Sequence, residues 1–302
     1  MKNKMDFEVI IVGGSYAGLS AALTLGRSLR RVLVIDSGKP CNSPTPHSHN
    51  FITQDGMAPR EIAEAAKAQV LKYNTVEFHH GLAISGTKTE GGFEIKTHGN
   101  GTFTAQKLLF ATGVFDIMPD IDGFAACWGK SVLHCPYCHG YEARHQKIGL
   151  LGNGPMTFEF CRHLSNWSGQ LVLFTNGKST LTREETAKIR SHQIEVIEKE
   201  ILAFEHREGY LDKVVFSDGS DHQVSALFAR AEFKQHCDIP AQMGCELTEH
   251  GLIKTDEFQR TSLPGIFAAG DNVSFFRAVS IAAASGTKAG AAINKELIEE
   301  SF

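Results

Sequence analysis

The sequence predicts an α/β protein, because the same strand–turn–helix–strand pattern occurs twice. The first copy covers residues 7–36 and the second covers residues 147–174. In both copies a short apolar strand runs into a glycine-rich turn, and a helix and another strand follow. Two further apolar segments, 107–113 and 265–271, end at or next to a glycine. Strands that alternate with helices favour parallel sheets, which bind ligands at the carboxyl ends of their strands.

Composition and charge limit the classes of partner. At 302 residues the chain is long enough for two domains of ordinary size. Its net charge of −4 argues against nucleic acid or an anionic membrane as the main partner. No apolar run reaches the roughly 18 residues that a membrane span needs. The start has no secretory signal, and the seven cysteines form no disulfide framework, so we expect a cytoplasmic protein.

The first copy carries a nearly complete dinucleotide-binding pattern. A glycine turn at residues 13–18 joins a β-branched strand to a helix, and Asp36 ends the second strand. Such a turn lets a pyrophosphate lie on the helix N-terminus, and the acidic residue can bond an adenosine ribose hydroxyl. Ser15 takes the place of the usual middle glycine and is small enough to be tolerated. The predicted cofactor contacts are Gly13, Ser15, Tyr16, Ala17, Gly18 and Asp36.

Two later segments are expected to complete this site. The strand at 107–113 ends in a glycine, and the strand at 265–271 ends in a Gly-Asp pair whose carboxylate suits a ribityl hydroxyl of a flavin. A helix of small residues follows, and its positive N-terminal end can stabilise negative charge on a reduced flavin ring. The predicted contacts from these segments are Ala111, Thr112, Gly113, Gly270, Asp271, Arg277, Ala278 and Val279.

Cys135 and Cys138 form a C-x-x-C pair between the two glycine turns. Such a pair can close a disulfide, bind zinc or carry out redox chemistry. Zinc normally needs a second pair of ligands at similar spacing, and the other five cysteines contain no second C-x-x-C. His134 and His139 flank the pair, but one short loop rarely supplies four ligands to one metal. We therefore expect a redox dithiol and no metal.

The second glycine turn is less complete as a nucleotide site. Gly152 and Gly154 supply part of the tight turn, but Thr157 replaces its third small residue. Residues 175–178, after the next strand, contain neither an arginine nor an acidic residue. A strand over residues 226–232 is expected to end on Glu232, whose carboxylate would repel a phosphorylated nucleotide. The sequence therefore predicts a degenerate nucleotide site at Gly152 and Gly154.

In their order along the chain, the motifs GGSYAG, ATG, CPYC and AAGD resemble those of the two-dinucleotide-binding flavoproteins, and within them the low-molecular-weight thioredoxin reductase family. The resemblance covers essentially the whole chain. It implies two Rossmann-like dinucleotide-binding domains, the second inserted into the first. Residues 1–117 and 245–302 would form an FAD-binding domain, and residues 118–244 an NAD(P)-binding-like domain that carries the dithiol. The linkers would lie at 118–123 and near 237–240. Non-covalent FAD and a homodimer are also implied.

The resemblance also assigns roles. In the family the second cysteine faces the flavin, which implies that Cys138 reacts with the flavin and Cys135 exchanges with the substrate. His139 stands where the ordinary family has an acid–base aspartate, and histidine can activate a thiol near neutral pH. The resulting CxxCHG is similar to that of gliotoxin-type dithiol oxidases, which pass electrons from a small dithiol to oxygen. His47 and His49 lie where relatives approach the flavin ring, and are candidate flavin contacts.

These observations predict an FAD-dependent thiol–disulfide oxidoreductase with Cys135, Cys138 and His139 as catalytic residues. Electrons would pass between the flavin, the dithiol and either a thioredoxin-like protein or a small dithiol or disulfide substrate. NAD(P)H is doubtful as a reductant, because NADPH-dependent relatives carry basic residues where this chain has residues 175–178. Two alternatives stay open: a dithiol oxidase that uses oxygen, and a flavin-binding redox sensor without turnover.

Overall fold

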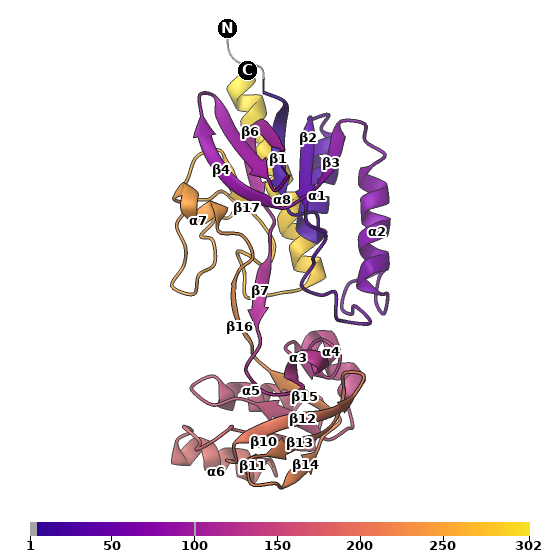
Figure 1. Ribbon diagram of the computed structural model, residues 1–302, viewed down its shortest axis with the longest axis vertical. Coiled ribbons are helices and arrows are strands. Elements are labelled where there is room, and N and C mark those ends of the chain that lie inside the picture. Colours follow the sequence, from indigo (N-terminus) through magenta and orange to yellow (C-terminus); the bar gives the residue numbers. More distant parts are fainter. Residues whose placement is uncertain (1–4, 100) are drawn as a thin grey trace.

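The computed structural model describes residues 5–99 and 101–302 and consists of two lobes (Figure 1). The indigo strands from the start of the chain and the yellow helix from its end lie together in the upper lobe. The magenta-to-orange middle of the chain forms the lower lobe. The second lobe is therefore built from a segment inserted into the first, which confirms the predicted α/β arrangement.

A seven-stranded sheet forms the first lobe. Because β6 has nine residues, it pairs with β5 along its first half and with β17 along its second half. The first three strands, β6 and β17 run parallel, whereas β4, β5 and β6 form an antiparallel meander. The strands in spatial order are β3 (Val76–His80), β2 (Val32–Asp36), β1 (Phe7–Val12), β6 (Thr102–Phe110), β5 (Gly92–Thr97) and β4 (Ala83–Thr89), with β17 (Ile266–Ala268) beside β6.

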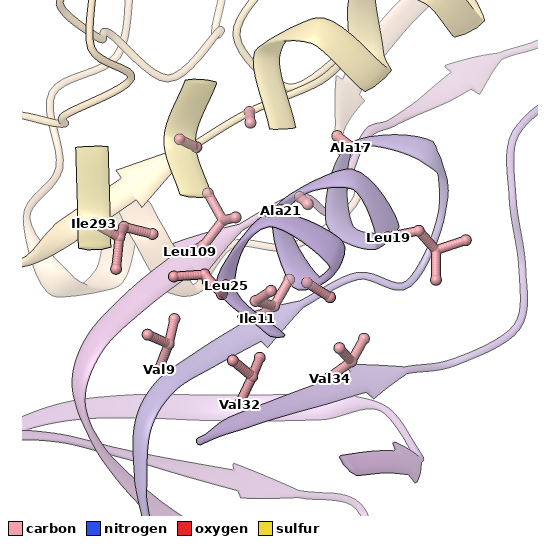
Figure 2. Close-up of a cluster of buried hydrophobic side chains, with 14 of the residues drawn as sticks. Val9, Ile11, Ala17, Leu19, Ala21, Leu25, Val32, Val34, Leu109 and Ile293 are labelled. Carbon is pink, nitrogen blue, oxygen red and sulfur yellow. The ribbon is translucent and has the colours of Figure 1, made fainter. Parts of the chain in front are cut away.

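Alternating residues of β1 divide the core of the first lobe into two layers. Val9 and Ile11 face the helices α1 (Tyr16–Arg27) and α8 (Val279–Ser301), and Figure 2 shows this layer. Ile10 and Val12 face the opposite side, where they pack with the meander and with Ile239. The helix α2 (Pro59–Val70) lies beside α1, and the short helix α7 (Ile239–Met243) lies against β4.

The helices α1 and α8 approach each other closely because small residues line their contact. A Cβ atom placed on Gly286 would lie only 2.8 Å from the Cα atom of Ala17, and one on Gly290 would lie 2.9 Å from the Cβ atom of Thr24. Real Cβ contacts are not this short, so both positions require glycine. This close packing fixes the start of α8 beside the glycine turn that begins α1.

The second lobe has a parallel sheet between two different layers. Helices α4 (Pro136–Ala143), α5 (Thr157–Leu164) and α6 (Arg183–Ser191) cover one face, and α3 (Phe124–Cys127) with a three-stranded antiparallel sheet covers the other. The parallel order is β11 (Glu195–Ile197), β10 (Leu171–Phe174), β9 (Ile148–Leu151), β15 (Ala226–Ala229) and β8 (Val132–Leu133). The antiparallel strands are β12 (Ile201–Arg207), β13 (Tyr210–Phe216) and β14 (Asp221–Gln223).

Two antiparallel strands, β7 (Val114–Ile117) and β16 (Glu232–Gln235), carry the chain between the lobes (Figure 1). Both crossings therefore come earlier than the linkers expected at 118–123 and near 237–240. Ile239 already packs in the core of the first lobe. The connection is a regular pair of strands, and neither expected linker includes them.

Candidate active site

A cavity of about 780 Å³ lies where β1 and β2 end, and it extends to the crossing strands and the start of α4. Its volume is in the range of small-molecule and cofactor sites. It collects predicted residues from both lobes. Those that line it are Gly13, Ser15, Tyr16, Ala17, Asp36, His47, His49, Ala111, Thr112, Gly113, Cys138, His139, Gly270, Asp271, Arg277, Ala278 and Val279.

The glycine turn after β1 has the geometry of a ligand cradle. Gly13 has a φ of +107°, and the amide of Gly14 donates to Oδ1 of Asp36 at 3.1 Å. A Cβ atom on Gly14 would lie 2.8 Å from the Cβ atom of Asp36. Gly18 is absent from the described cavity lining, because it packs α1 onto the turn: a Cβ atom there would collide with the carbonyl oxygen of Gly13. The glycines therefore let the turn pack tightly against Asp36 and against α1, as the turn of a dinucleotide site requires.

The segment after β17 closes another side of the cavity. Gly270 has a φ of +93°, and its amide donates to Oγ of Ser285 in α8 at 3.0 Å. Asn272 is fully buried, and its side-chain amide donates to the carbonyl oxygen of Phe110 at 2.9 Å. This hydrogen bond joins the ends of β6 and β17. The sequence reading missed Asn272, although a polar residue directly after a Gly-Asp pair was the available signal.

Arg277 is held between two acidic side chains at the edge of the cavity. Its guanidinium donates to both carboxylate oxygens of Asp116, at 2.6 and 3.0 Å, and its Nε lies 3.5 Å from Oδ2 of Asp271. Burial opposes the charge of Arg277, but the bond to Asp116 raises the pKa of the guanidinium above its ordinary value. Burial raises the pKa of Asp271, and Arg277 works against that shift. The sequence reading missed Asp116, although the strand V-F-D-I places the aspartate on its buried face.

The dithiol lies at the start of α4. Cys135 occupies the N-cap position, Pro136 the first helical position, and Cys135 and Cys138 are joined as a disulfide. The amides of Cys138 and His139 each donate to the carbonyl oxygen of Cys135 at 3.2 Å. Cys138 lines the cavity, whereas Cys135 is not part of the lining formed by the described residues. Of the two cysteines, Cys138 is therefore the one that borders the cavity.

Two histidines flank the dithiol in the sequence, and a third, His49, lies near the ring of His139. Burial, followed by repulsion from the nearby His49, lowers the pKa of His139 to about 4. Neither ring nitrogen of His139 has a hydrogen-bond partner within the described part of the chain. Burial, followed by repulsion from Arg277, also lowers the pKa of His134 to about 4. His47 differs from these, because its Nδ1 lies 3.0 Å from the carbonyl oxygen of Gly56 within its own loop. His139 is thus a buried neutral imidazole near neutral pH.

The second glycine turn joins β9 to α5, as the sequence predicts, and its side chains bond to one another. Gly154 has a φ of +121°. Asn153 donates to the carbonyl oxygen of Lys178 and accepts from the amide of Thr180, both at 2.9 Å. These bonds tie the turn to the loop after β10. The strand expected to end on Glu232 ends instead at Ala229, and Glu232 begins the exposed crossing strand β16. The expected strand is therefore three residues too long, and Glu232 follows the end of β15 at a distance of three positions.

Within residues 5–99 and 101–302, no group of three or more histidine, cysteine, aspartate or glutamate side chains could hold a metal ion. In the same ranges, no helix is long and apolar enough to cross a membrane.

Comparison with known proteins agrees with the fold. The family model described as pyridine nucleotide-disulphide oxidoreductase matches residues 7–286. The chain is 33% identical to thioredoxin reductase tcpT of Claviceps purpurea, over 97% of this chain and 95% of that protein. It is 31% identical to thioredoxin reductase aclD of Aspergillus oryzae, over 96% of each chain. The crystal structure of an oxidoreductase from Agrobacterium tumefaciens matches with a TM-score of 0.92 at 36% identity, over 98% of this chain and 99% of that one. The chain therefore belongs to the pyridine nucleotide-disulphide oxidoreductase family and is a thioredoxin reductase-like FAD-dependent disulfide oxidoreductase.

Proposed function

We propose that the protein moves electron pairs between the flavin and a dithiol or disulfide substrate through Cys135 and Cys138. The observation that carries this proposal is that Cys138 belongs to the described cavity lining and Cys135 does not. Cys138 lines the cavity that also contains the glycine turn and Asp271, whereas Cys135 lies outside the lining formed by the described residues. This arrangement supports Cys138 as the sulfur that faces the cofactor and Cys135 as the sulfur that meets the substrate.

The residues around the cavity fit FAD, which membership of the family implies. Gly13 and Gly14 line the cavity at the start of α1, where a pyrophosphate would lie, and Asp36 lines it at the end of β2 for a ribose hydroxyl. Asp271 and the start of α8 would hold the ribityl and ring portions at the other end. The flavin would supply two-electron redox chemistry at this site.

The chain's own groups can carry the thiol steps. A substrate thiol gives its proton to His139, and the resulting thiolate attacks Sγ of Cys135. The Cys135–Cys138 bond breaks, and Cys138 takes the electron pair as a thiolate, which the N-terminus of α4 favours. The second substrate thiol then attacks the substrate sulfur of the mixed disulfide and its proton passes to the leaving sulfur of Cys135, so the substrate leaves as a disulfide and Cys135 is released as a thiol. Two electrons and two protons have then moved from the substrate to the protein.

For the direction of electron transfer, we favour the oxidation of a small dithiol, with oxygen as the final electron acceptor. His139 replaces the acid–base aspartate of ordinary relatives, which supports the gliotoxin-type alternative. The bonds of Asn153 to the loop after β10 support weak use of NAD(P)H. The names of the fungal relatives point instead to a thioredoxin-like disulfide as substrate. We further propose a homodimer, and two domains that are separated at β7 and β16.

The test is reduction of the bound flavin by a dithiol under anaerobic conditions. Purified protein should contain about one FAD per chain, and dithiothreitol should bleach it in a single turnover. Protein that folds without FAD and does not take up added FAD would refute the cofactor site. A flavin that neither dithiols nor pyridine nucleotides reduce would favour a redox sensor over an enzyme.

A further inference from the structure

A single tyrosine hydroxyl joins three segments that border the cofactor cavity. Tyr16 is the first residue of α1 and follows the glycine turn. Its hydroxyl donates to the carbonyl oxygen of Pro59, the first residue of α2, at 3.1 Å. The same hydroxyl accepts from the side-chain amide of Asn42 at 3.3 Å. Asn42 belongs to the segment between β2 and α2, so the hydroxyl connects this segment to the starts of both helices.

Residues 37–49 form one side of the cavity, and we call this segment the strap. Every residue of the strap lines the cavity. Most of these residues are exposed, and within the strap only Ser48 is buried. A segment that buries so little apolar surface opens easily unless other contacts hold it. The hydrogen bond between Asn42 and Tyr16 is a contact of this kind, and it lies near the middle of the strap.

The surroundings of Tyr16 suit it to hold the strap. The residue is buried and belongs to the core cluster that α1 forms with the sheet. Burial raises the pKa of the hydroxyl above its ordinary value, so the group keeps its proton near neutral pH and can donate to Pro59. A hydroxyl can donate one hydrogen bond and accept others, which matches the two bonds in the structure. The buried ring therefore presents a hydroxyl in a fixed position to Asn42.

We propose that the hydroxyl of Tyr16 holds the strap along the cavity and thereby slows the release of bound FAD. Tyr16 is a positioning residue in this role, because its hydroxyl acts through Asn42 and the strap. The role rests on the proposed function, in which this cavity holds FAD. A cofactor in the cavity would lie against the strap, so displacement of the strap would remove contacts from the cofactor and open the cavity on that side.

Tyr16→Phe tests this role with the smallest change, because it removes the hydroxyl and keeps the ring. Both hydrogen bonds are lost, and since one such bond typically changes an equilibrium by about two- to tenfold, we expect FAD release to become about tenfold faster. Full-length holoprotein is loaded with isotope-labelled FAD and mixed with an excess of unlabelled FAD. Mass spectrometry of desalted samples then follows how much labelled FAD stays with the protein. Release at the wild-type rate would overturn the inference.

Tyr73→Phe is the matched control, because it also removes one tyrosine hydroxyl from the first lobe. The hydroxyl of Tyr73 accepts from Nη1 of Arg27 at 2.8 Å, in an exposed hydrogen bond. Tyr73 is not part of the described cavity lining. This variant should release FAD at the wild-type rate. An equal acceleration in both tyrosine variants would mean that the effect does not come from the strap, and would overturn the inference.

A double variant tests whether Asn42 acts through the hydroxyl. Asn42→Ala should accelerate release by less than Tyr16→Phe does, because it removes only one of the two hydrogen bonds. The double variant Tyr16→Phe/Asn42→Ala should be no faster than Tyr16→Phe alone, since residues that act through one interaction are not additive. A double variant that releases FAD faster than Tyr16→Phe would show that Asn42 acts independently, and would contradict the proposed role.

Hydrogen exchange of the Tyr16→Phe holoprotein distinguishes a role through the strap from a general loss of structure. Exchange should rise in residues 37–49 and stay unchanged in α1. An equal rise in both would mean that the hydroxyl supports the helix and not the strap. If the wild type retains FAD and Tyr16→Phe behaves like it in both measurements, this inference is wrong and the cofactor site stands. If the wild type takes up no FAD, the proposed function is itself wrong.

Discussion

Asp116 accepts two hydrogen bonds from the guanidinium of Arg277, at 2.6 and 3.0 Å, and both side chains are largely buried. Asp116 belongs to the crossing strand β7, and Arg277 comes directly before α8 at the edge of the cavity. A bidentate pair of this kind fixes orientation as well as charge. It therefore fastens the connection between the lobes to the segment that borders the proposed flavin site.

Asp116→Asn is expected to destabilise the protein by about 3 kcal/mol, because it leaves a buried guanidinium without its bidentate partner. Urea titration of the purified variant measures this loss. Glu64→Gln is the control, since Glu64 pairs with Arg60 on the surface and such pairs contribute less than about 1 kcal/mol. Equal losses in the two variants would show that the buried pair has no special part in holding the crossing strand.

Serine variants of the two cysteines are expected to differ in their flavin chemistry. Cys138→Ser should abolish electron exchange between the dithiol and the flavin while FAD binding stays normal. Cys135→Ser should leave a free Cys138 facing the flavin, visible as a long-wavelength absorption band from the thiolate beside the flavin. Absorption spectra and dithiothreitol titrations of both variants check this. If Cys135→Ser lost electron exchange with the flavin and Cys138→Ser gave the absorption band, the roles of the two cysteines would be reversed. The dithiol would still be part of the mechanism.

Gly18→Ala should weaken FAD retention although Gly18 is not part of the described cavity lining. The added Cβ atom collides with the carbonyl oxygen of Gly13, so the glycine turn and the start of α1 must separate. Overpacking of this kind costs about 1–3 kcal/mol, and we expect at least a tenfold loss of FAD affinity by equilibrium dialysis. Gly169→Ala serves as the control, because a Cβ atom there meets nothing within 4 Å. An unchanged affinity in Gly18→Ala would mean that the turn does not hold the pyrophosphate.

Alkylation should distinguish Cys135 from the buried thiols. Burial raises the pKa of Cys161 to about 12 and that of Cys237 to about 11, so neither forms appreciable thiolate at pH 7.5. After reduction with one equivalent of dithiothreitol, iodoacetamide should label Cys135 first, since it caps the N-terminus of α4 and lies outside the described cavity lining. Peptide mass spectrometry gives the order. Earlier labelling of Cys138 would contradict the proposed orientation of the pair.

The sequence predicted the parts of the site that local patterns encode. Glycine turns, apolar strands and the C-x-x-C pair are short motifs, and their order implied both the fold and the family. The close approaches that the glycines of the first turn permit, such as that of Gly14 to Asp36, are present in the structure. The spacing of the C-x-x-C pair alone could not assign different roles to Cys135 and Cys138. The family resemblance distinguished the two cysteines, and of the two only Cys138 belongs to the described cavity lining.

Contacts between distant segments could not be predicted from the sequence. Asp116 and Arg277 are 161 positions apart, and the pairing of His49 with Glu142 depends on how the lobes meet. The end of β15 was misplaced because residues 226–232 form one apolar-rich run, whereas the chain breaks after Ala229 and begins the crossing strand. Periodicity gives the type of an element, but tertiary pairing decides where it ends.

The most direct test of the account is anaerobic reduction of the bound flavin, followed at ~450 nm, with dithiothreitol, NADH and NADPH in parallel. Dithiothreitol should bleach the wild-type flavin and fail with Cys138→Ser. NADPH should reduce it poorly and NADH only modestly better, because each lost nucleotide contact costs on the order of 1–3 kcal/mol. Rapid reduction by micromolar NADPH, with dithiothreitol inert, would contradict the account and make the protein an ordinary NADPH-dependent reductase.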